Sequence, residues 1–152
     1  MTTFLIEGGA RLGGSIEASG NKNAALPMLA ATLLTDQAVT LTRLPAIADV
    51  ATMCEALADI GASVDRNTAG RVSVRAANLR TTSPNVSICQ RVRASFVLAG
   101  PLLARAGRAE LPAPGGDRIG RRPLDTHIIA FQALGAEVEV KQIGRASCRE
   151  RV

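Results

Sequence analysis

The sequence predicts an α/β domain built from duplicated units in which apolar helices are buried against strands. Apolar runs with helical spacing alternate with short segments in which apolar and polar residues alternate. The order helix, strand, proline-marked loop, helix, strand occurs twice. The junction Ile60-Gly61-Ala62-Ser63-Val64 returns seventy-four residues later as Leu134-Gly135-Ala136-Glu137-Val138, a period too long for a solenoid.

Composition narrows the class of protein. The 152 residues are enough for one domain with a core, and a hydrophobic content of 47% argues against disorder. With three Phe, no Tyr and no Trp, the core must consist of Ala, Leu, Val and Ile, and platforms for stacking single-stranded nucleic acid are missing. The net charge of +5 comes from scattered arginines, which favours contacts to phosphate or carboxylate over a nucleic-acid face.

The cysteines and the N-terminus predict a cytoplasmic protein. Cys54, Cys89 and Cys148 have no metal-ligand spacing and form no even-numbered framework, which fits a reducing compartment. Cys54 and Cys89 are expected to be small packing residues. The N-terminus lacks the apolar core of a signal peptide, and no apolar run approaches membrane-spanning length.

The elements of the first unit follow from periodicity and turn residues. The first helix is apolar nearly all round, which predicts burial. Pro45 ends the strand after it, and Gly61 stands where a helix-terminating glycine belongs. The predicted elements are strands at 4–6 and 15–18, a helix over 24–34, a strand over 38–44, a helix over 49–60 capped by Asp49, short strands at Val64 and around 72–74, and a loop over 78–84.

The second unit repeats this order. An apolar helix is predicted over 94–104, followed by a short strand at 109–111 and a loop rich in glycine and proline. A helix from about Thr126 carries Ile128, Phe131 and Leu134 on one stripe, and a strand follows Gly135.

The last eleven residues, 142–152, differ from the rest of the chain because they show no apolar periodicity. They also resemble the in-frame translation of a common sequencing-library adaptor. We therefore expect the natural coding sequence to be cut near Lys141 and Cys148 to be foreign to the protein. Setting this segment aside removes three Arg and one Glu, which lowers the net charge from +5 to +3. A genuine basic tail is the alternative.

The first candidate site is the stretch 19–27. Gly20 allows a sharp turn, and Asn21 and Asn23 are good helix caps. Lys22 and Asn23 should therefore stand at a helix N-terminus, where unpaired N–H groups, the helix dipole and a lysine favour an anion. A capped helix with a solvated lysine is the alternative.

The second candidate site is the loop 112–127, in which three glycines and three prolines fix an unusual path. Asp117 lies at its tip, with Arg118, Arg121 and Arg122 nearby. This arrangement fits a carboxyl that acts as general acid or base beside arginines that bind an anionic substrate. A solvent-exposed loop with screened charges is the alternative.

Four sequence motifs follow one another along the chain. They are Ser19-Gly20-x-Lys22-Asn23-Ala24-Ala25-Leu26-Pro27, Arg93-Ala94-Ser95, Gly100-Pro101-Leu102 and Pro114-Gly115-Gly116-x-x-Ile119-Gly120-x-Arg122-Pro123-x-Asp125-x-His127. In this order, from about residue 3 to residue 140, the chain resembles the enolpyruvyl transferase family, in particular the UDP-N-acetylglucosamine 1-carboxyvinyltransferases. The two loop motifs together are highly specific.

The resemblance implies transfer of the enolpyruvyl group of phosphoenolpyruvate to the 3′-hydroxyl of UDP-N-acetylglucosamine with release of phosphate. This is the first committed step of peptidoglycan synthesis, and so serves cell wall biogenesis, cell shape and cell division. The family needs no metal or other cofactor. The implied partners are the two substrates, with no nucleic acid, no membrane and no obligate protein partner.

The resemblance also implies the roles of individual residues. Lys22 matches the lysine that contacts phosphoenolpyruvate, and Asp117 stands where most members have a cysteine that donates a proton to the enolpyruvyl methylene. This sequence belongs to an aspartate subset. Near neutral pH such a donor needs its pKa raised by burial or by another carboxylate, whereas neighbouring arginines act against this. The implied substrate-binding residues are Lys22, Asn23, Arg93, Arg122, Pro123, Leu124, Asp125, Thr126 and His127. Arg91 and Arg121 are expected to be solvated.

Family members are much longer and close two similar domains of β-α-β repeats on the substrates. By this resemblance, residues 1–20 are first strands that belong with the missing second domain. Residues 21–141 are a partial nucleotide-sugar-binding domain with about two repeats, and 142–152 are the adaptor-derived tail. The chain is therefore expected to be a truncated and inactive fragment.

Two alternatives remain open. One is a transferase of the related 5-enolpyruvylshikimate-3-phosphate synthase type, against which the Pro-Gly-Gly-Asp and Arg-Pro-Leu-Asp-Thr-His motifs argue. The other is a non-catalytic nucleotide-sugar-binding module. Such a module would not need Lys22 or Asp117, and the presence of both favours catalytic ancestry.

Overall fold

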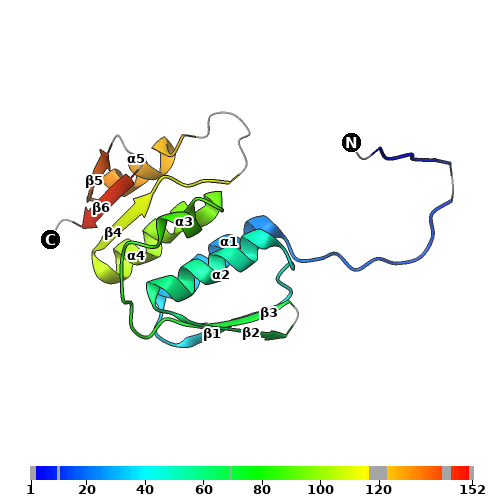
Figure 1. Ribbon diagram of the computed structural model, residues 1–152, viewed down its shortest axis with the longest axis horizontal. Coiled ribbons are helices and arrows are strands. Elements are labelled where there is room, and N and C mark those ends of the chain that lie inside the picture. The colour runs from blue at the N-terminus through cyan, green and yellow to red at the C-terminus, as the bar shows by residue number, and fades with distance from the viewer. Residues whose placement is uncertain (1–2, 10, 69, 117–122, 142–144, 151–152) are drawn as a thin grey trace.

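The computed structural model describes residues 3–9, 11–68, 70–116, 123–141 and 145–150 (Figure 1). Helices and strands alternate along them, which confirms the predicted α/β class. In order they are α1 (Lys22–Ala31), the 3₁₀-helix η1 (Thr32–Leu34), β1 (Ala38–Leu41), α2 (Ala48–Ile60), β2 (Ser63–Thr68), β3 (Arg71–Arg75), α3 (Val86–Cys89), the 3₁₀-helix η2 (Arg93–Leu98), α4 (Ala99–Ala106), β4 (Arg108–Pro112), α5 (Asp125–Ala133), β5 (Ala136–Lys141) and β6 (Arg145–Glu150).

The first unit is a β-α-β motif with a third strand in its middle. The sheet order is β1-β3-β2 and both pairings are antiparallel, so β1 and β2 run parallel and α2 crosses between them. The alternation expected from the sequence holds. Val72 and Val74 of β3 are buried, whereas Ser73 places its Oγ 2.8 Å from Oγ1 of Thr40 in β1.

The second unit repeats this topology. Its sheet order is β4-β6-β5, again with antiparallel pairs, so α5 crosses between the parallel strands β4 and β5. The duplication predicted from the sequence is thereby confirmed at the level of strand order. Residues 145–150, for which the sequence shows no apolar periodicity, form the middle strand β6.

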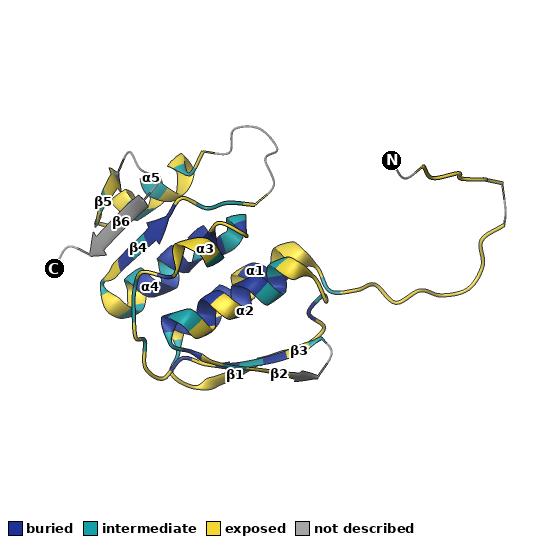
Figure 2. Ribbon diagram, in the orientation of Figure 1, coloured by how far each residue is buried: buried dark blue, intermediate teal, exposed yellow. Residues whose placement is uncertain are grey.

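The core lies in the helical layer between the two sheets (Figure 1). Figure 2 shows buried residues along α1, α2 and α4 but none on α5. Most core residues are Ala, Leu, Val and Ile, as predicted, but Met53, Cys54 and Phe96 also belong to the core. The largest fully buried side chains include Leu29, Leu33, Met53, Leu57, Ile60, Leu98, Leu102 and Leu111.

The ends of α2 both confirm and correct the sequence interpretation. Gly61 ends the helix with a left-handed φ of 117°, as predicted. The prediction that Asp49 caps the helix is wrong, because Ile47 is the cap residue and its side chain makes no capping bond. Asp49 lies instead in the first turn, where a carboxylate is stabilised by the helix dipole.

The helix predicted over 94–104 is more irregular than expected. It begins as the 3₁₀-helix η2 and continues as α4, and the short helix α3 before it was not predicted. Four residues are too few to show a helical period. The side chain of Asn85 caps α3, since its Oδ1 accepts a hydrogen bond of 2.9 Å from the Ser87 N–H.

The two N-terminal strand predictions are wrong for this chain. Among the described residues before α1 there is no strand, and Phe4, Leu5 and Ile6 are 83–90% exposed. Figure 1 shows this segment extending away from the rest of the molecule. A strand is held by hydrogen bonds to a neighbour, and the two sheets formed by the described strands do not include this segment.

Candidate active site

The N-terminus of α1 is built as the sequence predicts. Asn21 is the cap residue, and its Oδ1 accepts hydrogen bonds from the backbone N–H groups of Asn23 at 2.7 Å and Ala24 at 3.2 Å. Lys22 and Asn23 are therefore the first two residues of the helix. Gly20 is needed for close packing, since a Cβ there would lie 1.8 Å from the backbone oxygen of Arg43.

Lys22 reaches across to the neighbouring helix. Its Nζ forms an ion pair with Oδ2 of Asp49 in the first turn of α2. The side chain of Lys22 is 50% exposed and that of Asp49 is 31% exposed, so the pair lies at a wet surface. Lys22 is therefore a half-exposed lysine held in an ion pair, not a lone solvated one.

The segment before α4 brings two arginines to the same place. Ser95 is buried, and its Oγ donates to the backbone oxygens of Val92 at 2.9 Å and Cys89 at 3.1 Å, which fixes the turn that opens η2. Arg93, the motif arginine, is half-buried at the start of η2. Arg91 is exposed, as expected, and it also forms an ion pair with Glu55 of α2.

The glycine-rich loop lies against this turn. The N–H groups of Gly115 and Gly116 donate to the backbone oxygens of Cys89 at 3.3 Å and Gln90 at 3.1 Å. A Cβ at Gly115 would lie 1.6 Å from the Gln90 oxygen, and Gly116 has a left-handed φ of 85°. Both glycines are thus required for the loop to approach so closely.

Residues 117–122 lie outside the described part of the structure. The predicted proton donor Asp117 and the predicted substrate-binding residue Arg122 fall in this segment, as do Arg118 and Arg121. Their assignments stay predictions from the sequence. The described loop nevertheless places Gly116, the residue before Asp117, at the same hollow as Lys22 and Arg93.

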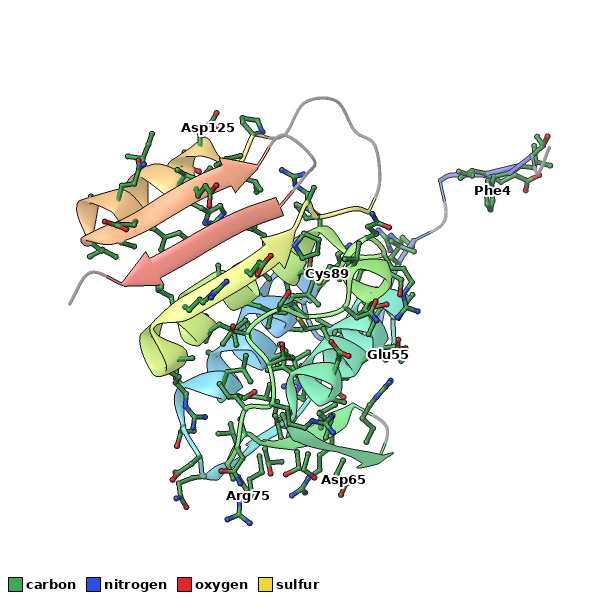
Figure 3. The ribbon with its side chains drawn as sticks, turned by 60° about the vertical axis from the view of Figure 1, so that its left-hand side comes forward. Phe4, Glu55, Asp65, Arg75, Cys89 and Asp125 are labelled. Atoms are coloured by element: carbon green, nitrogen blue, oxygen red, sulfur yellow. The ribbon has the colours of Figure 1, made fainter. Side chains whose placement is uncertain are left out.

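The start of α5 supplies another side of the site. Pro123, Leu124 and His127 line the hollow, and the His127 ring packs on Phe96 with 5.5 Å between ring centroids. Asp125 and Thr126 belong to the first turn of α5 but are not among the lining residues. Figure 3 shows Asp125 on the same side of the helical layer as the second sheet.

These parts enclose a hollow of about 560 Å³. Its wall includes the first turns of three α-helices, since Lys22 and Asn23 belong to α1, Asp49 to α2 and His127 to α5. Helix N-termini carry partial positive charge and unpaired N–H groups, which favours an anionic ligand. The described residues lining the hollow are Lys22, Asn23, Leu26, Asp49, Arg91, Val92, Arg93, Ala94, Phe96, Val97, Gly116, Pro123, Leu124 and His127.

Of the predicted substrate-binding residues, the structure brings Lys22, Asn23, Arg93 and His127 together from segments far apart in the sequence. Pro123 and Leu124 join them. The sequence interpretation missed Asp49, Arg91 and Phe96 as lining residues. Asp49 had a signal, an acidic residue at a helix start, but it was assigned to capping, whereas Arg91 and Phe96 had none.

Three further observations concern the described residues. No group of three or more His, Cys, Asp or Glu side chains there is arranged to hold a metal ion. No helix there combines the length and the hydropathy that crossing a membrane requires. Burial raises the pKa of the thiols of Cys54 and Cys89. Both are then protonated near neutral pH, in keeping with a packing role.

Comparisons with known proteins match the chain to 1-carboxyvinyltransferases. Residues 6–149 match the family model of EPSP synthase (3-phosphoshikimate 1-carboxyvinyltransferase). A UDP-N-acetylglucosamine 1-carboxyvinyltransferase of Bradyrhizobium diazoefficiens is 50% identical over 89% of this chain and 31% of its own length. One of Treponema pallidum is 44% identical over 100% of this chain and 36% of its own length.

A solved structure agrees on the fold. The enolpyruvyl transferase NikO from Streptomyces tendae has a TM-score of 0.76 at 23% identity, over 95% of this chain and 31% of its own. The chain therefore spans about a third of the length of the relatives it matches. With a matched region that runs through nearly all of its elements, the chain belongs to the EPSP synthase family of carboxyvinyltransferases.

Proposed function

We propose that this chain is part of a UDP-N-acetylglucosamine 1-carboxyvinyltransferase. The whole enzyme would move the enolpyruvyl group of phosphoenolpyruvate to the 3′-hydroxyl of UDP-N-acetylglucosamine and release phosphate. The observation that carries the proposal is the hollow at which Lys22, Asn23, Arg93 and His127 meet. The 50% identity to a relative with this name points to the same acceptor.

The chemistry suits the cations and helix ends at the hollow. Phosphoenolpyruvate carries a phosphate and a carboxylate, and the acceptor carries a diphosphate, so both ligands need fixed positive groups. Lys22 is proposed to contact phosphoenolpyruvate as a compact point charge, and Arg93 to contact the nucleotide sugar through its planar fork. The backbone N–H groups of Asn23 and Ala24 are taken by the Asn21 cap, so α1 contributes the positive end of its dipole and Asn23 its side-chain amide toward the same anions.

The second loop and the start of α5 complete the proposal, with Asp117 and Arg122 outside the described residues. Asp117 is proposed to donate a proton to the enolpyruvyl methylene, and Arg122 to bind near both substrates. The run from Arg122 to Thr126 is proposed to hold the uridine end, with His127 close to it. Transition-state charge is stabilised most by groups fixed in a closed, water-excluded site.

The domain organisation follows from the same proposal. Residues 1–20 would pair with a second domain and 21–141 would form part of the nucleotide-sugar-binding domain. Residues 142–152 would be an adaptor-derived tail, of which 145–150 form the middle strand β6 in this chain. The 152-residue chain would then carry one wall of the active site and be inactive alone. The enzyme would act in the cytoplasm in peptidoglycan synthesis, and through the cell wall it would support cell shape and division.

The test is phosphate release by the full-length protein encoded by the genomic reading frame. Phosphoenolpyruvate is supplied with either UDP-N-acetylglucosamine or shikimate 3-phosphate. Turnover with the UDP-sugar supports the proposal, whereas turnover with shikimate 3-phosphate alone would move the protein to the other branch of the family. Lys22→Ala should abolish most turnover. Arg75→Ala is the control, because Arg75 lies at the far end of the molecule from Asp125 (Figure 3).

The proton donor gives a second test. Fosfomycin alkylates the loop cysteine of most relatives, and a carboxylate is a far poorer nucleophile than a thiolate. The full-length enzyme with Asp117 should therefore keep its activity in fosfomycin, and Asp117→Cys should become sensitive. Covalent inactivation of the unsubstituted enzyme, with the added mass on the Asp117 peptide, would contradict this assignment.

A further inference from the structure

Asp49 is a residue of the hollow to which neither the motifs nor the proposed function assign a role. Its Oδ2 pairs with Nζ of Lys22, and both side chains line the hollow. Lys22 opens α1 and Asp49 lies in the first turn of α2, so the ion pair joins the N-termini of two packed helices.

The two partners differ in how firmly they are held. Asp49 has a short side chain on a helix whose next residues, Val50 and Met53, are 3% and 0% exposed. Its charge is also stabilised by the dipole of α2. Lys22 carries its ammonium on a flexible four-carbon stem that is half exposed. The carboxylate is therefore the fixed partner and the ammonium the one that is restrained.

We propose that Asp49 is a positioning residue for Lys22. It holds the ammonium over the hollow, so that an anionic ligand meets a charge already in place. The inference rests on the proposed function for the identity of that ligand, which carries a phosphate group. Such restraint fixes the approach of the reacting group, while the negative charge of Asp49 competes with the anion for Lys22.

This role predicts opposite effects on binding and on turnover. Asp49→Asn removes a negative charge that competes for Lys22, so a simple anion such as inorganic phosphate should bind more tightly. The same change releases the lysine stem, so turnover that needs the ammonium at one position should fall. A purely structural residue would lower both together.

The binding arm uses the 152-residue chain itself. The sequence has only two lysines, Lys22 and Lys141, so ¹⁵N-lysine NMR can follow the Lys22 ammonium during titration with inorganic phosphate. For Asp49→Asn we expect about 1.5- to fivefold tighter binding, the range for one partly exposed charge pair. Asp36→Asn is the matched control, because it removes one carboxylate beyond the opposite end of α1 and should leave the affinity unchanged.

The turnover arm uses the full-length enzyme. Asp49→Asn should lower kcat about 10- to 100-fold without raising KM, and Asp49→Glu, which keeps the charge, should restore most of the loss. Should Asp49→Asn fail to fold by circular dichroism, Asp49→Ser, a smaller neutral side chain at this partly exposed position, carries the same two expectations.

Each outcome decides the inference. Unchanged or weaker phosphate binding in the folded Asp49→Asn chain would overturn it, as would an unchanged kcat in the full-length variant. Failure of the proposed function looks different. In that case the unsubstituted full-length protein would release no phosphate with either acceptor, while the NMR titration would still show whether Asp49 restrains Lys22.

Discussion

The two β-α-β units share a strand order, yet their crossing helices are covered very differently. At the offset of seventy-four residues, Ile60 at the end of α2 corresponds to Leu134 after α5. Ile60 is 0% exposed and Leu134 is 85% exposed. The helix α2 packs against α1, α3, η2 and β2, whereas α5 packs mainly against β5. Equivalent sequence signals thus specify a helix and its end, but neighbours decide whether that helix is buried.

The difference extends to the outer faces of the two helices. Glu55 of α2 pairs with Arg91 and is half exposed, as a solvent-facing position should be. Its counterpart in α5 is Ile129, which is 63% exposed. With Leu134, and with Val140 of β5 at 61% exposed, the second unit presents apolar side chains that the first unit does not. Exposed apolar side chains that gather in one region are typical of surfaces that associate with other protein.

The largest expected effect on unfolding free energy comes from truncating an aliphatic side chain at equivalent positions of the two units. Ile60→Ala should lower the free energy of unfolding by about 2–5 kcal/mol, because it leaves a cavity in a fully buried site. Leu134→Ala should change it by about 0.5 kcal/mol or less, as for other exposed positions. Urea unfolding of the 152-residue chain measures both. Equal losses would show that α5 is buried in solution.

The glycines that end the helices give the next effect. Gly61 and Gly135 both have left-handed φ angles, of 117° and 92°. A Cβ at Gly61 would lie 2.8 Å from the backbone nitrogen of Arg80, whereas one at Gly135 would meet nothing within 4 Å. Gly135→Ala should cost about 1–2 kcal/mol of unfolding free energy from backbone strain alone. Gly61→Ala should cost roughly 2–3 kcal/mol, since strain of 1–3 kcal/mol is joined by displacement of the chain at Arg80. If the two variants unfold at the same urea concentration, the contact at Arg80 has no energetic weight.

The junction between the units gives a third effect. Nη1 of Arg105 in α4 donates to the backbone oxygens of Leu33 at 3.0 Å, Thr35 at 3.2 Å and Ala76 at 2.5 Å, all in the first half of the chain. Arg105→Met keeps much of the stem but loses these bonds, and should cost about 1–3 kcal/mol. Arg108→Met is the control. The Arg108 side chain is exposed, and its Nη2 lies 3.5 Å from Oε2 of Glu110, which makes a weak ion pair. The comparison fails if both arginines contribute equally.

Much of this comparison could be predicted from the sequence, and the part that could not has a physical reason. The helices were located by the spacing of apolar residues and by the cap residues Asn21 and Gly61. The alternation of apolar and polar residues located β3. Local patterns do not encode which strands become neighbours, so the insertion of β3 and β6 between parallel strands was not foreseen. Nor could composition show that the apolar residues 4–6 would remain exposed, since a strand requires a partner.

For the candidate site, the predictions that succeeded concern local chemistry. Lys22 was placed at a helix N-terminus because caps and dipoles act over a few residues. Its partner Asp49 was not found, because the contact depends on how α1 and α2 pack. The same holds for Phe96 under His127, a pair formed by residues thirty-one positions apart.

The smallest expected effect on stability concerns the exposed face of the second unit, and it separates packing from association. Ile129→Glu gives α5 the residue type that α2 has at the equivalent position. Because Ile129 is 63% exposed, the unfolding free energy should change by about 0.5 kcal/mol or less.

Association should change much more, since a charge within an apolar patch opposes contact between copies. We expect the unsubstituted 152-residue chain to associate as its concentration rises in sedimentation velocity and to bind a hydrophobic dye. Ile129→Glu should shift association to higher concentration and reduce the dye signal, whereas Arg75→Glu, on the opposite sheet, should do neither. A strictly monomeric chain that binds no dye would show that this face is not a site of association, and would leave the difference between α2 and α5 as one of exposure alone.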